Sequence, residues 1–267
     1  MFKYTLILAF VVLLYGCGED SETPEETPTP SGSLVGTWLA TNVENELLVF
    51  SFFEDGTYLH AEIDLNMTAE QLEYQNSGME WGTYTRDNST GEMTSFSQYF
   101  DGNGDIGASS NDLDIDEVIF TVFDDNLTLT TDEDRNGTVD FEIDFVRVSS
   151  DDFVGSWVAT NSGSDFLQLI FFDDGTYLHA EVDFNMTAEE LMYQSSGMEW
   201  GTYTRDSSTG KITAVSQNLD NNGEIGFSDG SPDTDDIIFI VSGDEMTLTV
   251  DEDRNNVLET ELDFVRN

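Results

Sequence analysis

The sequence is poor in positive charge, in cysteine and in histidine. It has 55 Asp and Glu residues against 8 Lys and Arg, which gives a formal net charge of −47 over 267 residues. A surface of this sign repels phosphate groups, so nucleic acid and an anionic membrane surface are excluded as main partners. The single cysteine, Cys17, excludes a disulfide within the chain. The fold must therefore depend on its hydrophobic cores.

Apolar and aromatic residues are plentiful despite the acidity. They make up 38% of the chain and include 19 Phe, 9 Tyr and 4 Trp. Such a content is sufficient for packed cores and excludes disorder of the whole chain. The acidic residues are then expected on a solvated surface, with a cation-binding surface as the alternative.

The N-terminus has the form of an export signal. Lys3 precedes an apolar run from Tyr4 to Tyr15, which is too short for an ordinary transmembrane helix. Leu14-Tyr15-Gly16-Cys17 resembles the lipobox of bacterial lipoproteins. The resemblance implies removal of residues 1–16, lipid attachment at Cys17 and an anchor in the bacterial outer membrane, with exposure on the cell surface as an open alternative.

Residues 17–33 form a distinct segment after this signal. They contain three of the four prolines, several Thr, Ser and Glu residues, and no large apolar side chain. This composition is typical of an extended tether. We expect it to hold the folded part away from a membrane.

The remainder is an internal duplication with a constant offset of 119 residues. The motif Val35-Gly36-Thr37-Trp38 recurs as Val154-Gly155-Ser156-Trp157, and Phe145-Val146-Arg147 recurs as Phe264-Val265-Arg266. The pattern predicts two domains, residues 34–150 and 151–267. The short joint between them predicts close neighbours with restricted motion.

Each copy is expected to form about eight antiparallel strands. Alternating apolar and polar residues between turn signals predict strands in the first copy near 34–41, 46–54, 56–64, 79–87, 92–100, 116–123, 126–131 and 138–148. One short helix per copy is predicted from the capping boxes that begin at Thr68 and Thr187. This order favours two tandem up-and-down β-barrels, which leave no free edge, with a β-sandwich as the alternative.

Short motifs in both copies resemble the lipocalin or calycin pattern. The residues are Gly36, Trp38 and Arg147 in the first copy, and Gly155, Trp157 and Arg266 in the second. The resemblance implies that each Trp packs under the Arg of the closing strand. The strand pairs 52–58 and 171–177, followed by Glu-Trp-Gly-Thr-Tyr at 80–84 and 199–203, also resemble lipocalin-like repeats of bacterial lipoproteins.

Two acidic loops per copy are candidates for calcium, which prefers six to eight oxygen ligands. In 131–140 the candidate ligands are Asp132, Asp134, Asn136 and Asp140, and the second copy offers Asp251, Asp253, Asn255 and Glu259. The other loops offer Asp101, Asn103 and Asp105, and Asp220, Asn222 and Glu224. A plain acidic turn remains the alternative, because the closing twelfth position of an EF-hand loop is Ile143.

The two histidines, His60 and His179, occupy equivalent positions. On a strand, His60 faces the same side as Glu62, while Leu59 and Ala61 face the other. An acid/base or metal role would need a further partner, for which Asp64 or Glu80 is available. A polar strand face with a satisfied imidazole is the simpler interpretation.

These observations predict a non-catalytic binding or surface-interaction protein of the cell envelope, without a cofactor other than calcium. The expected ligand is a small apolar molecule in a barrel, or an extracellular polymer or protein at the rim loops. The alternatives are a purely structural surface lipoprotein and a hydrolase that uses His60 and Glu62.

Overall fold

The computed structural model describes residues 32–66, 77–102, 113, 116–163, 165–184, 196–220, 236–251, 254–255 and 257–267. Every regular element within these ranges is a β-strand, which confirms the all-β prediction. The helices expected from Thr68 and Thr187, the export signal, Cys17 and most of the tether fall outside the described ranges. No helix among the described residues is long and apolar enough to cross a membrane.

The first repeat contains eight strands whose bounds agree closely with the predicted ones. They are β1 Gly36–Ala40, β2 Glu46–Phe52, β3 Thr57–Asp64, β4 Gly78–Arg86, β5 Met93–Asp101, β6 Glu117–Phe123, β7 Asn126–Asp132 and β8 Phe141–Arg147. The second repeat contains β9 Gly155–Ala159, β10 Asp165–Phe171, β11 Thr176–Asp183, β12 Gly197–Arg205, β13 Ile212–Asp220, β14 Asp236–Ser242, β15 Glu245–Asp251 and β16 Thr260–Arg266.

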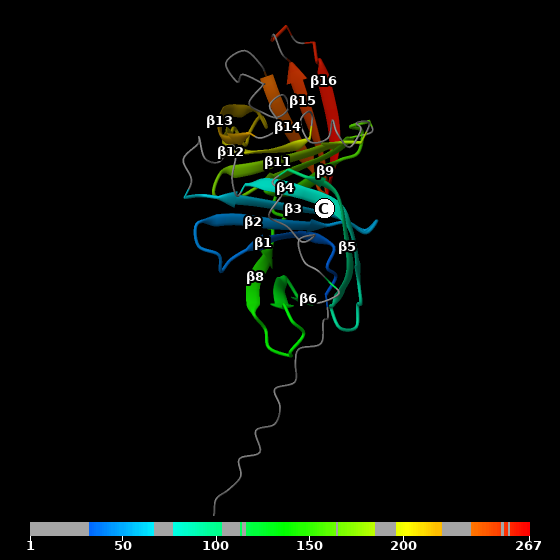
Figure 1. The fold of residues 1–267 in the computed structure, drawn as a ribbon. Coiled ribbons are helices and arrows are strands. Elements are labelled where there is room, and N and C mark those ends of the chain that lie inside the picture. The colour runs from blue at the N-terminus through cyan, green and yellow to red at the C-terminus, as the bar shows by residue number, and fades with distance from the viewer. Residues whose placement is uncertain are drawn as a thin grey trace, which may run out of the picture.

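Each repeat is an antiparallel meander whose last strand returns to its first. The strand order is β5-β4-β3-β2-β1-β8-β7-β6, and the second sheet follows the same order. Between the edge strands β5 and β6 an isolated bridge joins Glu92 to Ile119, and Lys211 and Ile238 are joined in the same way in the second repeat. The up-and-down order predicted from sequence is confirmed, with a seam at one side of each barrel-like sheet (Figure 1).

The closing contact of each barrel is a stacked Trp–Arg pair. The Arg147 guanidinium lies 4.1 Å from the ring centre of Trp38, and that of Arg266 lies 4.0 Å from Trp157. A Cβ at Gly36 would lie 2.0 Å from Arg147 Nη1, on a backbone with a φ of +130°. Glycine is required there because any side chain would displace the guanidinium.

The two repeats stack against each other through a shared hydrophobic core (Figure 1). Outward-facing side chains of β2 to β5, such as Leu59 and Trp81, meet their counterparts from β10 to β13, such as Phe166. The ring centres of Trp81 and Phe166 are 4.0 Å apart. Each buried side chain of this size contributes roughly 1.5–3 kcal/mol, so the predicted close association of the repeats has a physical basis.

A polar contact lies within this interface. Gln168, which is fully buried, donates from Nε2 to Ser51 Oγ at 2.8 Å and to Ser156 Oγ at 2.7 Å. At the C-terminus, Asn267 Nδ2 donates to Thr37 Oγ1 of the first repeat at 3.0 Å. These bonds specify how the two sheets align, because buried donors and acceptors must be paired.

Inside each barrel lies a separate core. The first contains Trp38, Phe52, Tyr58, Phe120 and Phe145, and the second contains their equivalents Trp157, Phe171, Tyr177, Phe239 and Phe264. Strand β3 therefore faces two cores, with Tyr58, His60 and Glu62 inside the barrel and Leu59, Ala61 and Ile63 toward the other repeat. This double burial positions the polar residues considered next.

Candidate functional site

Strand β3 carries a row of polar side chains into the first barrel. Its pairing with β4 places His60 opposite Glu80, and Glu80 is opposite Asp101 on β5. Directly opposite residues in an antiparallel pair lie on the same face of the sheet. Glu80, proposed from sequence as a partner for the histidine, therefore belongs to the same interior layer as His60.

His60 is buried and neutral. Its side chain is 4% exposed and its ring lies 4.5 Å from that of Phe50. Burial lowers the pKa of His60 to about 4, although the negative charge of Asp101 opposes the shift. Within the described part of the chain, Nδ1 has no hydrogen-bond partner. The imidazole thus has an unused polar atom, contrary to the simpler expectation of a satisfied ring.

Glu62 lies next to this imidazole and lacks a stable countercharge. Its Oε2 is 3.9 Å from His60 Nε2. Burial raises the pKa of Glu62 to about 7, and the negative charges of Glu46 and Asp64 add to the shift. Because His60 is neutral near pH 7, its contact with Glu62 does not offset the negative charge of the Glu62 carboxylate.

A second buried pair, Tyr58 and Glu80, lies deeper in the same layer. The Tyr58 hydroxyl donates to Glu80 Oε1, and Glu80 is 1% exposed. Burial and the adjacent carboxylate raise the pKa of Tyr58 far above its ordinary value, so the phenol remains a proton donor. In the second repeat Tyr177 donates to Glu199 at 2.5 Å. The sequence alone does not reveal this pair, because only the β3–β4 register brings the two residues together.

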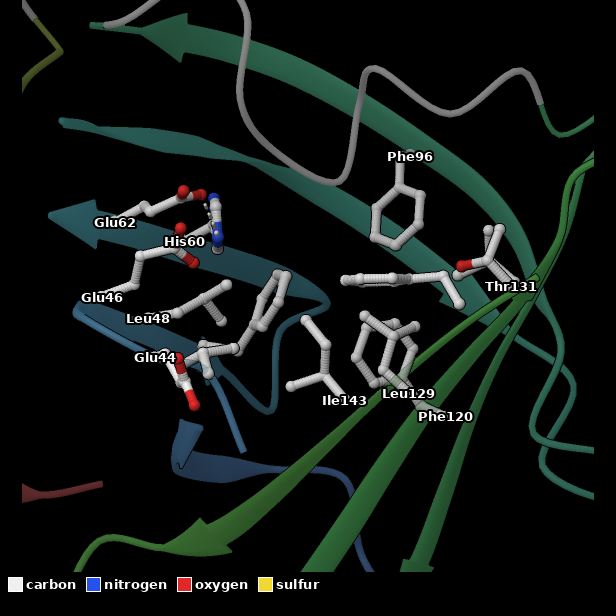
Figure 2. A pocket seen from close by; sticks show the side chains of 14 residues that line it. Glu44, Glu46, Leu48, His60, Glu62, Phe96, Phe120, Leu129, Thr131 and Ile143 are labelled. Atoms are coloured by element: carbon white, nitrogen blue, oxygen red, sulfur yellow. Dashed lines mark ion pairs between the residues drawn. The ribbon is translucent and has the colours of Figure 1, made fainter. Parts of the chain in front are cut away.

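Of the polar residues of this layer, His60 and Glu62 border a cavity of about 330 Å³ in the first barrel (Figure 2). Most of the lining is apolar, and the three carboxylates gather with His60 at one end. The full lining is Val43, Glu44, Glu46, Leu48, Phe50, His60, Glu62, Phe96, Val118, Phe120, Leu129, Thr131, Phe141 and Ile143. The volume is at the lower end of the range found for small-molecule pockets. Phe50 and Phe96, assigned from sequence to the core, form part of its wall.

The second repeat keeps the polar layer but changes the wall. His179 Nε2 lies 3.6 Å from Glu181 Oε2, and burial shifts the pKa values of the two groups to about 4 and about 7. Nine of the fourteen lining residues differ from their equivalents, and the largest changes replace Glu44, Phe50, Phe96, Thr131 and Phe141 by Gly163, Leu169, Val215, Val250 and Thr260. The polar layer is thus common to both repeats, whereas of the aromatic wall the second repeat keeps Phe120, as Phe239, but not Phe50 or Phe96.

A second hollow, of about 720 Å³, lies where the two repeats meet. Trp81, Phe166 and Phe184 line it together with Tyr99, whose side chain is 62% exposed. Asp55 and Asp165 also border it. It is an open aromatic groove between the sheets, and no buried polar atom without a partner among the described residues points to a particular ligand there.

Of the calcium candidates, the structure brings together Asp132, Asp134 and Asp140. One oxygen from each lies within 4.8 Å of the others. Asp132 also accepts hydrogen bonds from the backbone of Asn136 and Gly137, which lower the pKa of its carboxyl although burial acts in the opposite sense. The Asn136 side chain accepts from Thr138 N and so serves the turn itself. The loop follows β7 and closes on the start of β8.

The other calcium candidates are only partly within the described residues. Asp251 ends β15, accepts from Asn255 N at 3.0 Å and lies in a turn that Glu259 N closes onto Val250 O. Asp101 and Asp220 are the last residues of β5 and β13. Five candidates fall outside the described ranges: Asn103, Asp105, Asn222, Glu224 and Asp253.

Two glycine patterns that follow β5 and β13 in the sequence match enzyme motifs by spacing alone. Residues 102–107 have the spacing G-x-G-x-x-G, and residues 226–230 have the spacing G-x-S-x-G. The first motif needs a parallel βαβ unit, whereas β5 pairs antiparallel with β4. The second lacks its final glycine in the first repeat, and apart from Gly102 both patterns lie outside the described residues. Neither supports a catalytic assignment.

Comparison with known proteins adds little to this geometry. No family model and no curated protein matches the chain. A DNA polymerase sliding clamp from Pseudomonas aeruginosa aligns with 9% identity over 88% of this chain and 77% of the clamp, at a TM-score of 0.13. The Thermotoga maritima beta subunit of DNA polymerase III aligns with 10% identity over 87% and 76% of the two chains, also at 0.13. Scores this low carry no argument about fold or function.

Proposed function

We propose that this protein is a lipid-anchored, non-catalytic binding protein of the bacterial cell envelope that holds a small, mainly apolar ligand in its first barrel. The observation that supports this function is the cavity of about 330 Å³, whose wall includes Phe50, Phe96 and Phe120. Apolar walls with a few polar groups at one end are typical of small-molecule sites. The alternative is that the cavity holds no ligand and that the loops at the rim of the barrels recognise an extracellular polymer or protein.

Displacement of a neutral fluorescent probe tests this function. Nile red should bind the mature chain, and Val118→Phe should abolish most of that binding because the added ring fills the cavity that Val118 lines. Ile237→Phe, the equivalent change in the second repeat, provides the control. Equal binding by the wild type and Val118→Phe would contradict a site in the first barrel. Absence of any binding would favour a purely structural protein.

The anchor is tested separately from the cavity. Cys17→Ser removes the only thiol of the chain, and the variant should move from the membrane fraction to the soluble fraction after cell lysis. A single-residue change at Ser21, in the same tether, should leave the protein in the membrane. Membrane retention of Cys17→Ser would refute lipid attachment at this residue.

Calcium binding to the loop after β7 is a second, independent proposal. It is supported by the approach of carboxylate oxygens from Asp132, Asp134 and Asp140 within 4.8 Å, since closely spaced carboxylates suit a hard divalent cation. In this role calcium stabilises the β7–β8 hairpin and takes no part in ligand binding. Its test is a melting experiment in which calcium should raise the melting temperature and magnesium at equal ionic strength should not.

A further inference from the structure

The polar end of the first-barrel cavity is rich in carboxylates. Glu44, Glu46 and Glu62 line this end, and no Lys or Arg lines any part of the cavity within the described residues. Ionised carboxylates accept hydrogen bonds and cannot donate them. The site as built thus has several negative groups and no positive group to compensate them.

The arrangement of the lining gives the cavity a direction. Figure 2 shows Glu44, Glu46, Glu62 and His60 together on the left, and Phe96, Phe120, Leu129 and Thr131 on the right. Glu44 and Glu46 are exposed, whereas Phe120 is 1% exposed. The acidic end therefore meets solvent and the aromatic end is buried, so a ligand with one polar head and one apolar body is favoured over a uniformly apolar one.

His60 supplies an observation that does not depend on the acidic cluster. It is 3% exposed, lines the cavity, and its Nδ1 has no partner in the described part of the protein. A neutral imidazole has one N–H, and with Nε2 facing Glu62 at 3.9 Å we assign that proton to Nε2. Nδ1 is then a buried acceptor that requires a donor, and leaving such an atom unpaired is costly.

We propose that the ligand is a small amphiphilic amine, with a protonated head held between Glu62 and His60 Nδ1 and a hydrocarbon or aromatic body against Phe50, Phe96 and Phe120. This inference rests on the proposed binding function and specifies its ligand class. An ammonium group offers three donors and one positive charge, which matches both the unpaired acceptor and the uncompensated carboxylates. The aromatic faces add attraction for the cation and contact for the body.

Other ligand heads fit the same end less well. A carboxylate or phosphate head would be repelled by Glu44, Glu46 and Glu62 and would give Nδ1 no donor. A bare divalent cation would leave the apolar wall unused. A neutral alcohol could donate to Nδ1 but would not compensate the charge of Glu62. Measured affinities for an amine, an alcohol and a carboxylate with the same hydrocarbon chain should therefore fall in that order.

The test measures binding of octylamine, 1-octanol and octanoate to the chain from residue 17 onward carrying Cys17→Ser, by calorimetry at pH 7.5 and in about 150 mM salt to screen nonspecific attraction. The amine should bind at least about tenfold more tightly than the alcohol, and octanoate should bind most weakly. Glu62→Gln should reduce amine affinity about tenfold and leave alcohol affinity unchanged. Near-isosteric Gln preserves the shape of the cavity, and a melting curve verifies the fold.

Glu181→Gln, the equivalent change in the second repeat, is the matched control because it removes the same charge. It should alter amine affinity less than about twofold, since the second repeat has Leu169 and Val215 in place of Phe50 and Phe96. Equal binding of amine and alcohol would overturn the amine assignment and leave the apolar-ligand function standing. Equal losses in Glu62→Gln and Glu181→Gln would overturn its location, and no binding of any of the three compounds would refute the function itself.

Discussion

The two repeats share the residues that build the barrel and differ in those that face the cavity and each other. Trp38 and Trp157, with Arg147 and Arg266, occupy the same places and make the same contacts. The interface position held by Val49 in the first repeat is Gln168 in the second. After a duplication, the common positions indicate what one barrel needs, and the divergent positions indicate what the pair has gained.

The interface shows this divergence in a paired form. Gln168 of the second repeat bonds Ser51 of the first, whereas the residue equivalent to Ser51 is Ile170. At the two equivalent positions the first repeat has Val49 and Ser51, and the second has Gln168 and Ile170. The polar residue therefore lies at a different position in each repeat, and the two polar residues meet across the interface. Each repeat is therefore suited to the other and would not be replaced equally well by a second copy of itself.

Loss of the buried indole that both barrels share should destabilise the protein most. Trp38→Ala and Trp157→Ala should each lower the free energy of unfolding by about 3–5 kcal/mol, because both indoles are fully buried beneath an arginine. Urea denaturation followed by circular dichroism gives the two values. If one substitution cost less than about 1 kcal/mol, the Trp–Arg pair would not stabilise the two barrels equally.

The interface offers the next largest effect. Gln168→Ala leaves the Ser51 and Ser156 hydroxyls without their buried donor and should cost about 1–3 kcal/mol. The double variant Gln168→Ala with Ser51→Ala should cost less than the sum of the single changes, with a coupling of about 0.5 kcal/mol or more. Strict additivity in urea denaturation would show that the two side chains do not interact.

A smaller effect, equal in both repeats, is predicted for the buried carboxyls. Burial and the negative charges of Glu46 and Asp64 raise the pKa of Glu62 from 4.5 to about 7. The stability associated with its protonated form is present below pH 4.5 and is lost as the pH rises through about 7. Glu62→Gln should therefore be more stable than the wild type at pH 8, by about 1 kcal/mol after allowance for solvent screening, and equal to it at pH 4.

Thermal melts from pH 4 to pH 8 measure this difference, and Glu181→Gln should behave alike. His60 and His179 make the free energy of unfolding change with pH in the opposite direction. Burial lowers their pKa values from 6.5 to about 4, with Asp101 and Asp220 opposing the shift, so stability is lost as the pH falls from 6.5 toward 4. In the Gln variants the carboxyl no longer titrates, so the loss of stability caused by histidine protonation should be easier to measure. A constant gap between variant and wild type at all pH values would argue against an unusual pKa of Glu62.

The smallest expected effect concerns calcium. At a calcium concentration equal to the dissociation constant, the folded state gains about 0.4 kcal/mol, and more at higher concentration. Millimolar calcium should raise the melting temperature of the wild type slightly and reversibly, and Asp132→Asn should reduce that rise because it removes a carboxylate from the cluster. Magnesium at equal ionic strength provides the control. An identical rise with both ions would indicate charge screening instead of a site.

Much of the fold could be predicted from the sequence because alternation and turn chemistry are local properties. The predicted strand 56–64 and the observed β3 Thr57–Asp64 differ by one residue, and the placement of His60 and Glu62 on one face followed from the period of a strand. The duplication fixed the equivalence of the two repeats. These features need no knowledge of contacts between distant residues.

The cavity and the interface could not be predicted in the same way. Whether Phe50 packs solidly or borders a cavity depends on how β2, β5 and β8 converge, and alternation is the same in either case. Leu59 and Ala61 signalled a second apolar face of β3, yet only the stacked sheets show that the other repeat covers it. The pairing of Tyr58 with Glu80 likewise depends on strand register, which is a tertiary property.

The arginine above Trp38 has a mechanical consequence. Arg147 Nη1 donates to Val35 O at 3.0 Å and Nη2 donates to Ser33 O at 3.2 Å, so the last strand grips the chain where it enters the first. Tension applied ahead of Ser33 would pass to β1, whose hydrogen bonds to β2 and β8 lie across the strand axis. Those bonds would be loaded together in shear instead of being opened one at a time. A pull on the chain ahead of Ser33 would thus be resisted at once by both pairings of β1, with β2 and with β8.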